Sequence, residues 1–242
     1  DHGDEGINSD GVDIADDLYA MFIKPHLEDE GIIRVAGSNR YLTSVEASKQ
    51  GFWESGAEAV VIATGANWPD ALGGSALAGA VRGPLLLTKP DVLPTEVRNE
   101  IVRLKAKRAY ILGSTASVSA GVEASLKTLL GTGNVTRLGG TNRYETTRKV
   151  ADETIRLLGV AYTGEAFVAT GLNFPDATGA APVAAYMGRP ILLANVTAGT
   201  VYVPTKTKKV TILGATSAVP AGIETMLKTK LGSANVTRIA GT

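Results

Sequence analysis

A nine-residue segment that occurs twice constrains this chain more than any other feature. Residues 63–71 read Ala-Thr-Gly-Ala-Asn-Trp-Pro-Asp-Ala, and residues 169–177 read Ala-Thr-Gly-Leu-Asn-Phe-Pro-Asp-Ala. Each copy follows a β-prone apolar run and precedes a run rich in small residues, which predicts a strand, a tight turn and the start of a helix. A chain that repeats such a unit is built from modules, so the module has to be defined before any site.

A second repeated motif, Arg-x-Ala/Gly-Gly-Ser/Thr-Asn-Arg-Tyr, sets the length of the module. It begins at Arg34 and at Arg137, and a third, shorter match begins at Arg238, so the separations are 103 and 101 residues. We therefore expect an acidic leader, two full modules and the first strand of a truncated third module. The expected bounds of these four parts are 1–32, 33–134, 135–235 and 236–242.

Apolar runs and helical patterns alternate within each module. In the first module we expect strands at 32–36, 60–64, 84–88 and 109–112, and helices at 38–50, 69–81, 95–104 and 119–130. The strand at 84–88 begins Pro-Leu-Leu-Leu, and a run that is apolar at every position is typical of a strand covered on both faces. Alternating strands and helices predict right-handed crossovers and a parallel sheet. Each module is thus predicted to be a small three-layer α/β domain.

The composition excludes several classes of function. The 24 Lys and Arg residues balance 24 Asp and Glu residues, so the net charge gives no general attraction to nucleic acid. The only histidines, His2 and His26, precede the modules, and the chain has no cysteine. Histidine-based catalysis and thiolate metal sites are therefore not expected in the modules. The most apolar runs, 71–81 and 177–188, are too short to span ~30 Å of hydrocarbon.

The leader carries a partial calcium-loop pattern. Asn8, Asp10, Gly11 and Asp17 fall at positions 3, 5, 6 and 12 of such a loop. The first ligand position would be Gly6, which has no carboxylate. We therefore favour an acidic leader over a calcium site, and we expect no metal or cofactor elsewhere.

Four motifs occur in the same order in both modules and resemble the type 2 cell-wall-binding repeat of Gram-positive surface proteins. They are the two motifs above, then Pro-Leu-Leu-Leu or Pro-Ile-Leu-Leu, then Ile-Leu-Gly, and together they cover residues 33–242. The resemblance implies tandem Toprim-like modules, three of them packed around a pseudo-threefold axis, of which the third is incomplete here. It also implies a secreted protein held non-covalently to an anionic wall polymer such as teichoic acid.

The starts of the helices should lie beside a ligand, because open parallel sheets bind ligands beyond the carboxyl ends of their strands. We expect Ser38 and Thr141 to be N-caps and Pro69 and Pro175 to occupy first helical positions. The Gly- and Ala-rich helices that follow the two prolines have almost no side-chain bulk. They predict close packing under the sheet or at a module interface rather than a ligand site.

Two arginines, Arg40 and Arg143, should fall in first helical turns, where a cation opposes the helix dipole and requires an acidic partner. One interpretation is a structural ion pair with Asp70 or Asp176. The other is a guanidinium fork on a phosphate or carboxylate of a polymer. The full set expected to contact the polymer is Arg34, Arg40, Tyr41, Asn67, Asp70, Arg137, Arg143, Tyr144, Asn173 and Asp176.

Our hypothesis is a non-catalytic anchor that binds an anionic wall glycopolymer in grooves between modules, because weak sites used several times gain avidity. Asn67 and Asn173 either cap their turns or hydrogen-bond sugar hydroxyls. Two alternatives stay open. One is a polysaccharide-modifying enzyme that uses Asp70 and Asp176. The other is a self-assembling surface-layer scaffold or homo-oligomer, in which the strand at 236–240 docks on another chain or on its own first module.

Overall fold

The computed structural model describes residues 34–52 and 56–241. Both histidines and the calcium-loop pattern lie outside the described residues. The chain divides into two compact units, 1–36 and 37–242. Of the first unit, only residues 34–36 are described, and they are exposed and form no strand, so the strand expected at 32–36 is not observed in its described part.

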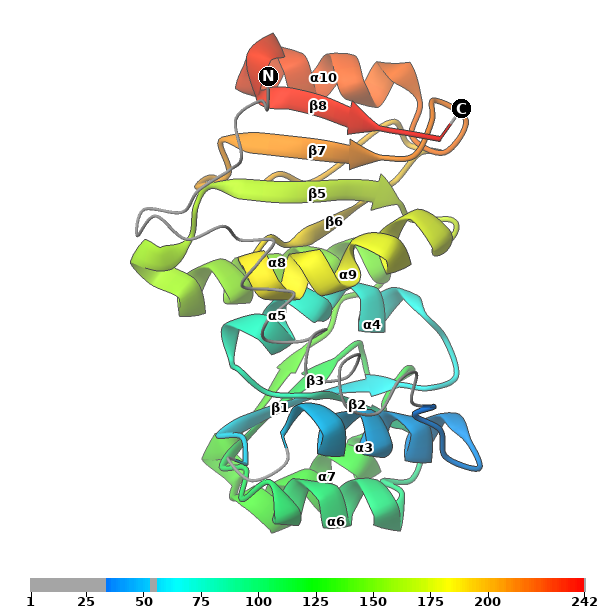
Figure 1. Ribbon diagram of the computed structural model, residues 1–242, viewed down its shortest axis with the longest axis vertical. Helices are drawn as coiled ribbons and strands as arrows, with labels where there is room; N and C mark the ends of the chain where they lie inside the picture. The colour runs from blue at the N-terminus through cyan, green and yellow to red at the C-terminus, as the bar shows by residue number, and fades with distance from the viewer. Residues whose placement is uncertain (1–33, 53–55, 242) are drawn as a thin grey trace, which may run out of the picture. The chain divides into compact units, whose positions relative to one another are not determined.

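The second unit contains two parallel sheets of four strands with the same strand order (Figure 1). The first sheet runs β2 (Leu85–Thr88), β1 (Ala59–Thr64), β3 (Arg108–Leu112), β4 (Val135–Leu138). The second runs β6 (Ile191–Ala194), β5 (Glu165–Thr170), β7 (Lys209–Leu213), β8 (Val236–Ile239). The predicted α/β fold with tandem layered modules is confirmed, because helices flank both sheets.

The sheets and the sequence repeats are offset by one strand. Strand β4 opens the second repeat but pairs with β3 at the edge of the first sheet. Strand β8 likewise pairs with β7, from Val210 opposite Val236 to Leu213 opposite Ile239. This corrects the expectation that the strand at 236–240 is unpaired and docks on another chain or on the first module. Each opening strand pairs in parallel with the strand that precedes it in the chain, because the helix between them (Ala120–Leu130 or Ala221–Leu231) crosses back along the sheet. A short 3-10 turn, Thr132–Asn134 or Ser233–Asn235, joins that helix to the strand.

One face of the first sheet is covered by three helices that lie together in Figure 1, and its core includes Ile62, Leu86 and Ile111. These helices are α3 (Arg40–Gly51), α6 (Thr95–Arg103) and α7 (Ala120–Leu130). In the second sheet α10 (Ala221–Leu231) takes the place of α7. The second repeat is shorter between β6 and β7, where the isolated bridge between Asn195 and Thr200 stands in place of a helix like α6.

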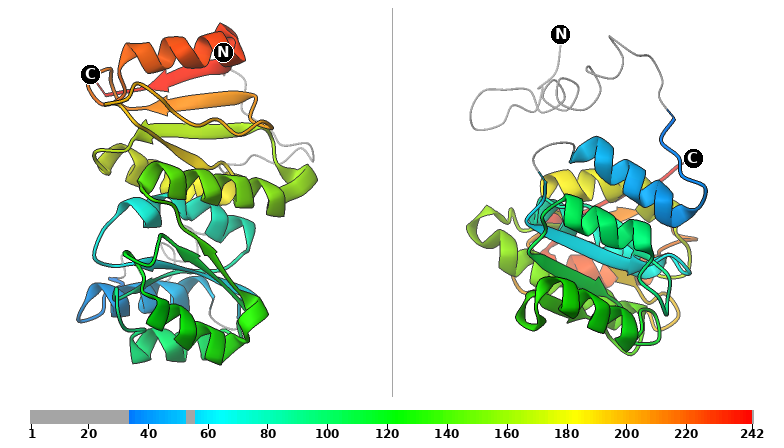
Figure 2. Two further views of the ribbon diagram at one scale, coloured as in Figure 1. Left: turned by 180° about the vertical axis from the view of Figure 1, so that it is seen from behind. Right: turned by 90° about the horizontal axis from the view of Figure 1, so that it is seen from below.

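The helices between the two sheets belong to a shared interior, which Figure 1 and the left view of Figure 2 show. They are α4 (Pro69–Gly73), α5 (Ser75–Ala80), α8 (Arg143–Leu158) and α9 (Pro175–Met187). On α8, Val150 packs into the core of the first sheet and Ala151 into that of the second. Ala76 of α5 also enters the core of the second sheet. The two repeats therefore pack against one another and do not form independent domains.

Small residues make this interior possible, as the sequence predicts. The helix expected at 69–81 is divided at Gly74 into α4 and α5. On α5, Gly79 faces Ala185 of α9, which is the residue at the equivalent position of the other repeat. A Cβ atom on Gly79 would overlap the Ala185 carbonyl oxygen. In the described part of the chain, no helix is both long and apolar enough to cross a membrane.

Candidate functional site

The arginine of each opening motif binds the Ala-Thr-Gly turn of its own repeat. In α3 the Arg40 Nη1 donates to the carbonyl oxygen of Gly65, and in α8 the Arg143 Nη1 donates to that of Gly171 at 2.6 Å. Neither arginine forms an ion pair within residues 34–52 and 56–241, so the expected pairs with Asp70 or Asp176 are not observed. The physical reason is that both carboxylates turn toward other loops, as described below.

The tyrosine that follows each arginine packs on the same turn. The Tyr41 ring lies against Gly65, and the Tyr144 ring lies against Gly171, so that a Cβ atom on either glycine would overlap a ring. Both tyrosines are half-buried. The two motifs of each repeat therefore form one structural unit, although Arg40 and Gly65 are 25 residues apart in the sequence. Only glycine at this turn leaves room for the tyrosine ring.

The helix caps lie one residue later than expected. Asn39, rather than Ser38, caps α3 by accepting hydrogen bonds of 3.0 Å from two N–H groups of the first turn. Asn142, rather than Thr141, caps α8 by accepting a hydrogen bond of 2.9 Å from the Glu145 N–H group. Thr141 is instead bonded through its own N–H and hydroxyl to Glu145, at 2.8 and 2.9 Å. Arg40 and Arg143 are then the first helical residues, as the sequence predicts.

The asparagines of the nine-residue motif use their side-chain oxygens in local turns. The side-chain oxygens of Asn67 and Asn173 accept hydrogen bonds of 2.9 Å from the N–H groups of the next residues, Trp68 and Phe174. Both asparagines are exposed, and within the described residues their side-chain NH₂ groups have no recorded acceptor. Pro69 and Pro175 begin α4 and α9 as expected. The turn is therefore capped and still offers hydrogen bonds to a ligand.

Residues of both repeats meet at a pocket of about 220 Å³, here called the seam pocket. The first repeat contributes its β1–α4 turn and the loop after β3, and the second contributes the start of α8. The lining residues are Asn67, Pro69, Asp70, Ser114, Ala116, Ser117, Gly140, Thr141, Asn142, Arg143 and Thr146. Three predicted site residues are thus brought together across the seam: Asn67, Asp70 and Arg143.

Asp70 is buried in the seam pocket with its carboxylate against Gly113. Burial raises the pKa of Asp70 above its ordinary value of 3.8, although a hydrogen bond from Ser117 and the charge of Arg143 act in the opposite direction. In the second repeat Asp176 lies against Gly214 in the same way but is exposed. The difference arises because the start of α8 covers Asp70.

The raised pKa makes Asp70 a source of pH-dependent stability. A carboxyl whose pKa is higher in the folded than in the unfolded state stabilises the fold at low pH, and this stability is lost as the pH rises through the folded-state pKa. We expect Asp70→Asn, which has no charge to bury, to be more stable than wild type at pH 7 and to lose this advantage below pH 3.8. Urea unfolding of both proteins across this range measures the effect. A variant that is less stable than wild type at every pH contradicts it.

Arg137, another predicted site residue, does not line the seam pocket. Arg137 on β4 donates from Nε to Glu123 at 2.7 Å, from Nη1 to the Gly113 carbonyl at 2.9 Å and from Nη2 to the Ser119 carbonyl at 3.4 Å. Arg238 on β8 makes three similar bonds in the second sheet, to Glu224 and to the carbonyl oxygens of Gly214 and Val219. Arg137 thus links the edge strand β4 to α7, and Arg238 links the edge strand β8 to α10. Arg34 is exposed in the other unit.

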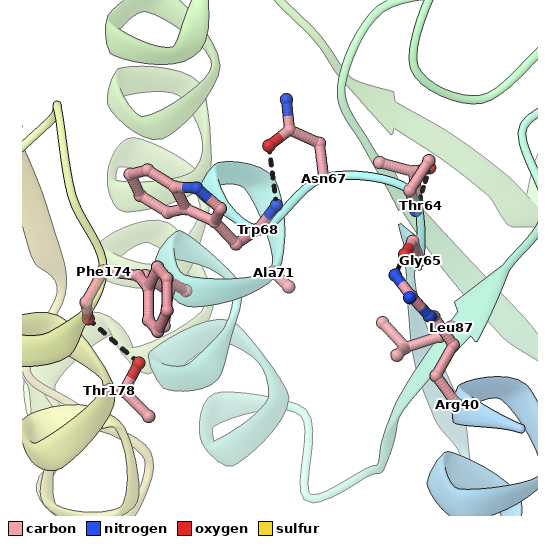
Figure 3. Close-up of a pocket in the computed structure, with 11 residues that line it drawn as sticks. Arg40, Thr64, Gly65, Asn67, Trp68, Ala71, Leu87, Phe174 and Thr178 are labelled. Carbon is pink, nitrogen blue, oxygen red and sulfur yellow. Dashed lines mark hydrogen bonds between the residues drawn. The ribbon is translucent and has the colours of Figure 1, made fainter.

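Sequence reasoning missed the aromatic residues beside the seam. The rings of Trp68 and Phe174 lie with centroids 5.8 Å apart, and the Arg143 guanidinium carbon lies 5.3 Å from the Trp68 ring. Trp68 and Phe174 line one side of a groove of about 410 Å³, here called the aromatic groove. Arg40 and Leu87 line its opposite side (Figure 3). The signal in the sequence was an aromatic residue before the proline in both copies of the nine-residue motif.

The described residues include no group of three or more His, Asp or Glu side chains placed to hold a metal ion. The geometry instead offers guanidinium and amide donors, an aromatic surface and one buried carboxylate. Such a surface is suited to holding a polar polymer that carries negative charge.

Comparison with known proteins identifies relatives of both repeats. A family model described as cell wall binding domain 2 matches residues 34–123 and 137–224. Among curated proteins of Bacillus subtilis, the N-acetylmuramoyl-L-alanine amidase LytC is 36% identical over 73% of this chain, and the amidase enhancer is 32% identical over 86%. The chain spans only 34% and 27% of the lengths of these two relatives.

Solved structures of two Clostridium difficile proteins share the fold. Cwp6 superposes with a TM-score of 0.73 and 25% identity over 89% of this chain, and Cwp8 with a TM-score of 0.75 and 28% identity over 94%. The superposed region is 36% of Cwp6 and 38% of Cwp8. The similarity therefore covers both repeats here but only part of each larger relative.

Proposed function

Because the chain belongs to the cell wall binding domain 2 family, we propose that it anchors a secreted protein to the cell wall by holding an anionic wall glycopolymer between its repeats. The chain acts as a non-catalytic binding module, and attachment is non-covalent. The polymer lies along the seam pocket and the aromatic groove, which adjoin at Asn67 and at the stacked pair of Arg143 and Trp68.

The placement of Arg143 carries this proposal. Its guanidinium lies where the two repeats meet, and its only recorded hydrogen bond among the described residues is the one to Gly171. The other N–H groups can donate to phosphate or carboxylate oxygens, the acceptors that a planar guanidinium binds best. The buried Asp70 reduces the positive potential of the seam pocket, so we expect polymer binding to strengthen as falling pH neutralises Asp70.

Removal of Arg143 should weaken attachment to walls. We expect the wild-type chain to sediment with purified Bacillus subtilis walls, to be released by salt, and to lose binding after acid extraction of the anionic polymer. Arg143→Ala should bind about tenfold more weakly, because it removes a charge-assisted contact. Sedimentation of increasing wall concentrations measures the apparent Kd.

The matched control is Arg156→Ala, which removes the same charge from the exposed side of the same helix. It should bind like wild type, and equal thermal midpoints show that both variants are folded. Undiminished sedimentation of the wild-type chain with acid-extracted walls, or binding that is insensitive to salt, would overturn the proposal even if Arg143→Ala does not fold.

The enzyme alternative depended on a pair of carboxylates. Asp70 lies against Gly113 in the first sheet, and Asp176 lies against Gly214 in the second, so the two side chains belong to different loops. The amidase activity in the name of one relative belongs to a protein of which this chain spans 34%. We therefore assign no reaction to the described residues.

A further inference from the structure

Two aromatic side chains at equivalent positions of the repeats meet where the repeats adjoin. The rings of Trp68 and Phe174 are inclined at 54° and have centroids 5.8 Å apart. Phe174 is nevertheless 48% exposed. Trp68 is half-buried, so both rings at the wall of the groove keep surface that a ligand can bury.

The opposite wall of the aromatic groove is cationic. Figure 3 shows Trp68 and Phe174 on one side, Arg40 on the other, and Ala71 between them. Arg40 is exposed, and its recorded hydrogen bond within the described residues is the one to the Gly65 carbonyl, so further N–H donors can face the groove. Among the described residues, those that line the groove include no Asp or Glu. The groove is therefore complementary to a ligand with one apolar face and one negatively charged group.

We propose that the aromatic groove binds one pyranose ring of the wall glycopolymer, and this inference rests on the function proposed above. The apolar C–H face of the ring stacks on Trp68 and Phe174, and an acidic substituent of the same sugar unit binds Arg40. Asn67 and Thr178 lie at the rim and can hydrogen-bond ring hydroxyls. A wholly apolar ligand fits less well, because it would cover the Arg40 guanidinium without pairing it.

The dimensions agree with a single sugar unit and its neighbours. The groove volume of about 410 Å³ is within the range of ~300–1,000 Å³ that is typical of small-molecule sites. Arg143 packs over Trp68 from the seam pocket, so the same indole connects the two parts of the site. A polymer can thus place one anionic group at Arg143 and the next sugar on the aromatic pair.

Loss of either aromatic face should weaken binding while leaving the charges unchanged. We expect Trp68→Leu and Phe174→Leu each to bind Bacillus subtilis walls about tenfold more weakly in the sedimentation assay. Tyr186→Leu is the matched control, because it removes an exposed aromatic ring of α9 that does not line the groove. It should bind like wild type.

A second measurement leaves the groove intact. In the variant Trp53→Phe, Trp68 is the only tryptophan, and acid-extracted polymer from the same walls should shift its fluorescence emission. Two wall treatments identify the charged group: carbodiimide amidation neutralises carboxylates, and hydrofluoric acid removes phosphate-linked polymer. Loss of binding after amidation identifies a carboxylate, and loss after hydrofluoric acid but not after amidation identifies a phosphate. Binding that survives both treatments would overturn the role of Arg40.

The two proposals fail in different ways. If the wild-type chain does not sediment with walls, the proposed anchoring function is wrong and the stacking inference is overturned with it. If wild type binds but Trp68→Leu and Phe174→Leu bind equally well, or the Trp68 emission does not respond to polymer, only the stacking inference is overturned.

Discussion

Gly79→Val should destabilise the chain by about 3 kcal/mol, the upper part of the usual cost of overpacking a well-packed interior. Gly79 lies on α5 directly against the backbone of α9 at Ala185. Unlike a flexible side chain, a carbonyl oxygen cannot turn aside to admit new atoms, so the two helices must separate. Equilibrium unfolding in urea measures the loss as a lower midpoint.

The control for this prediction is Gly179→Ala on α9. A Cβ atom at Gly179 has no neighbour within 4 Å. Since alanine has a better helix propensity than glycine, this variant should be unchanged or more stable by about 0.5–1 kcal/mol. An unfolding midpoint of Gly79→Val equal to that of wild type would show that α5 and α9 do not pack as closely as described.

Arg137→Ala should cost about 2–4 kcal/mol of folding stability, because it removes three hydrogen bonds and leaves Glu123 with one fewer partner in a largely buried site. The Arg137 side chain is only 16% exposed. Hydrogen bonds from Lys127 and Arg137 hold the pKa of Glu123 below its ordinary value. Thermal and urea unfolding measure the loss, and walls should still bind the fraction that remains folded.

Arg156→Ala again provides the comparison. Arg156 also bonds a glutamate, Glu153, through two nitrogens at 2.7 Å, but its side chain is 65% exposed. Exposed pairs contribute at most about 1 kcal/mol, so its loss should be small. If Arg137→Ala is as stable as Arg156→Ala and instead loses wall binding, Arg137 contacts the polymer, as the sequence first suggested.

Apart from the one-residue shift of the helix caps, the corrections to the sequence predictions share one cause, which is contact between segments far apart in the chain. Local rules placed Pro69 and Pro175 at helix starts and Arg40 and Arg143 in first turns. They did not reveal that β4 and β8 pair with the strands that precede them, because a short strand such as Val-Thr-Arg-Leu has the same sequence pattern whichever sheet it joins. They also treated all the motif arginines alike.

The sequence by itself determined the period, the α/β class and the motifs that recur, because these depend on residue spacing and on local backbone preferences. Only the tertiary structure decided that Arg137 holds an edge strand to a helix, whereas Arg40 and Arg143 line pockets. It also decided that one aspartate is buried and its twin exposed, and that two aromatic rings from different repeats adjoin. The reason is that burial, charge pairing and ring contact depend on which repeat packs over a residue, and identical motifs receive different neighbours.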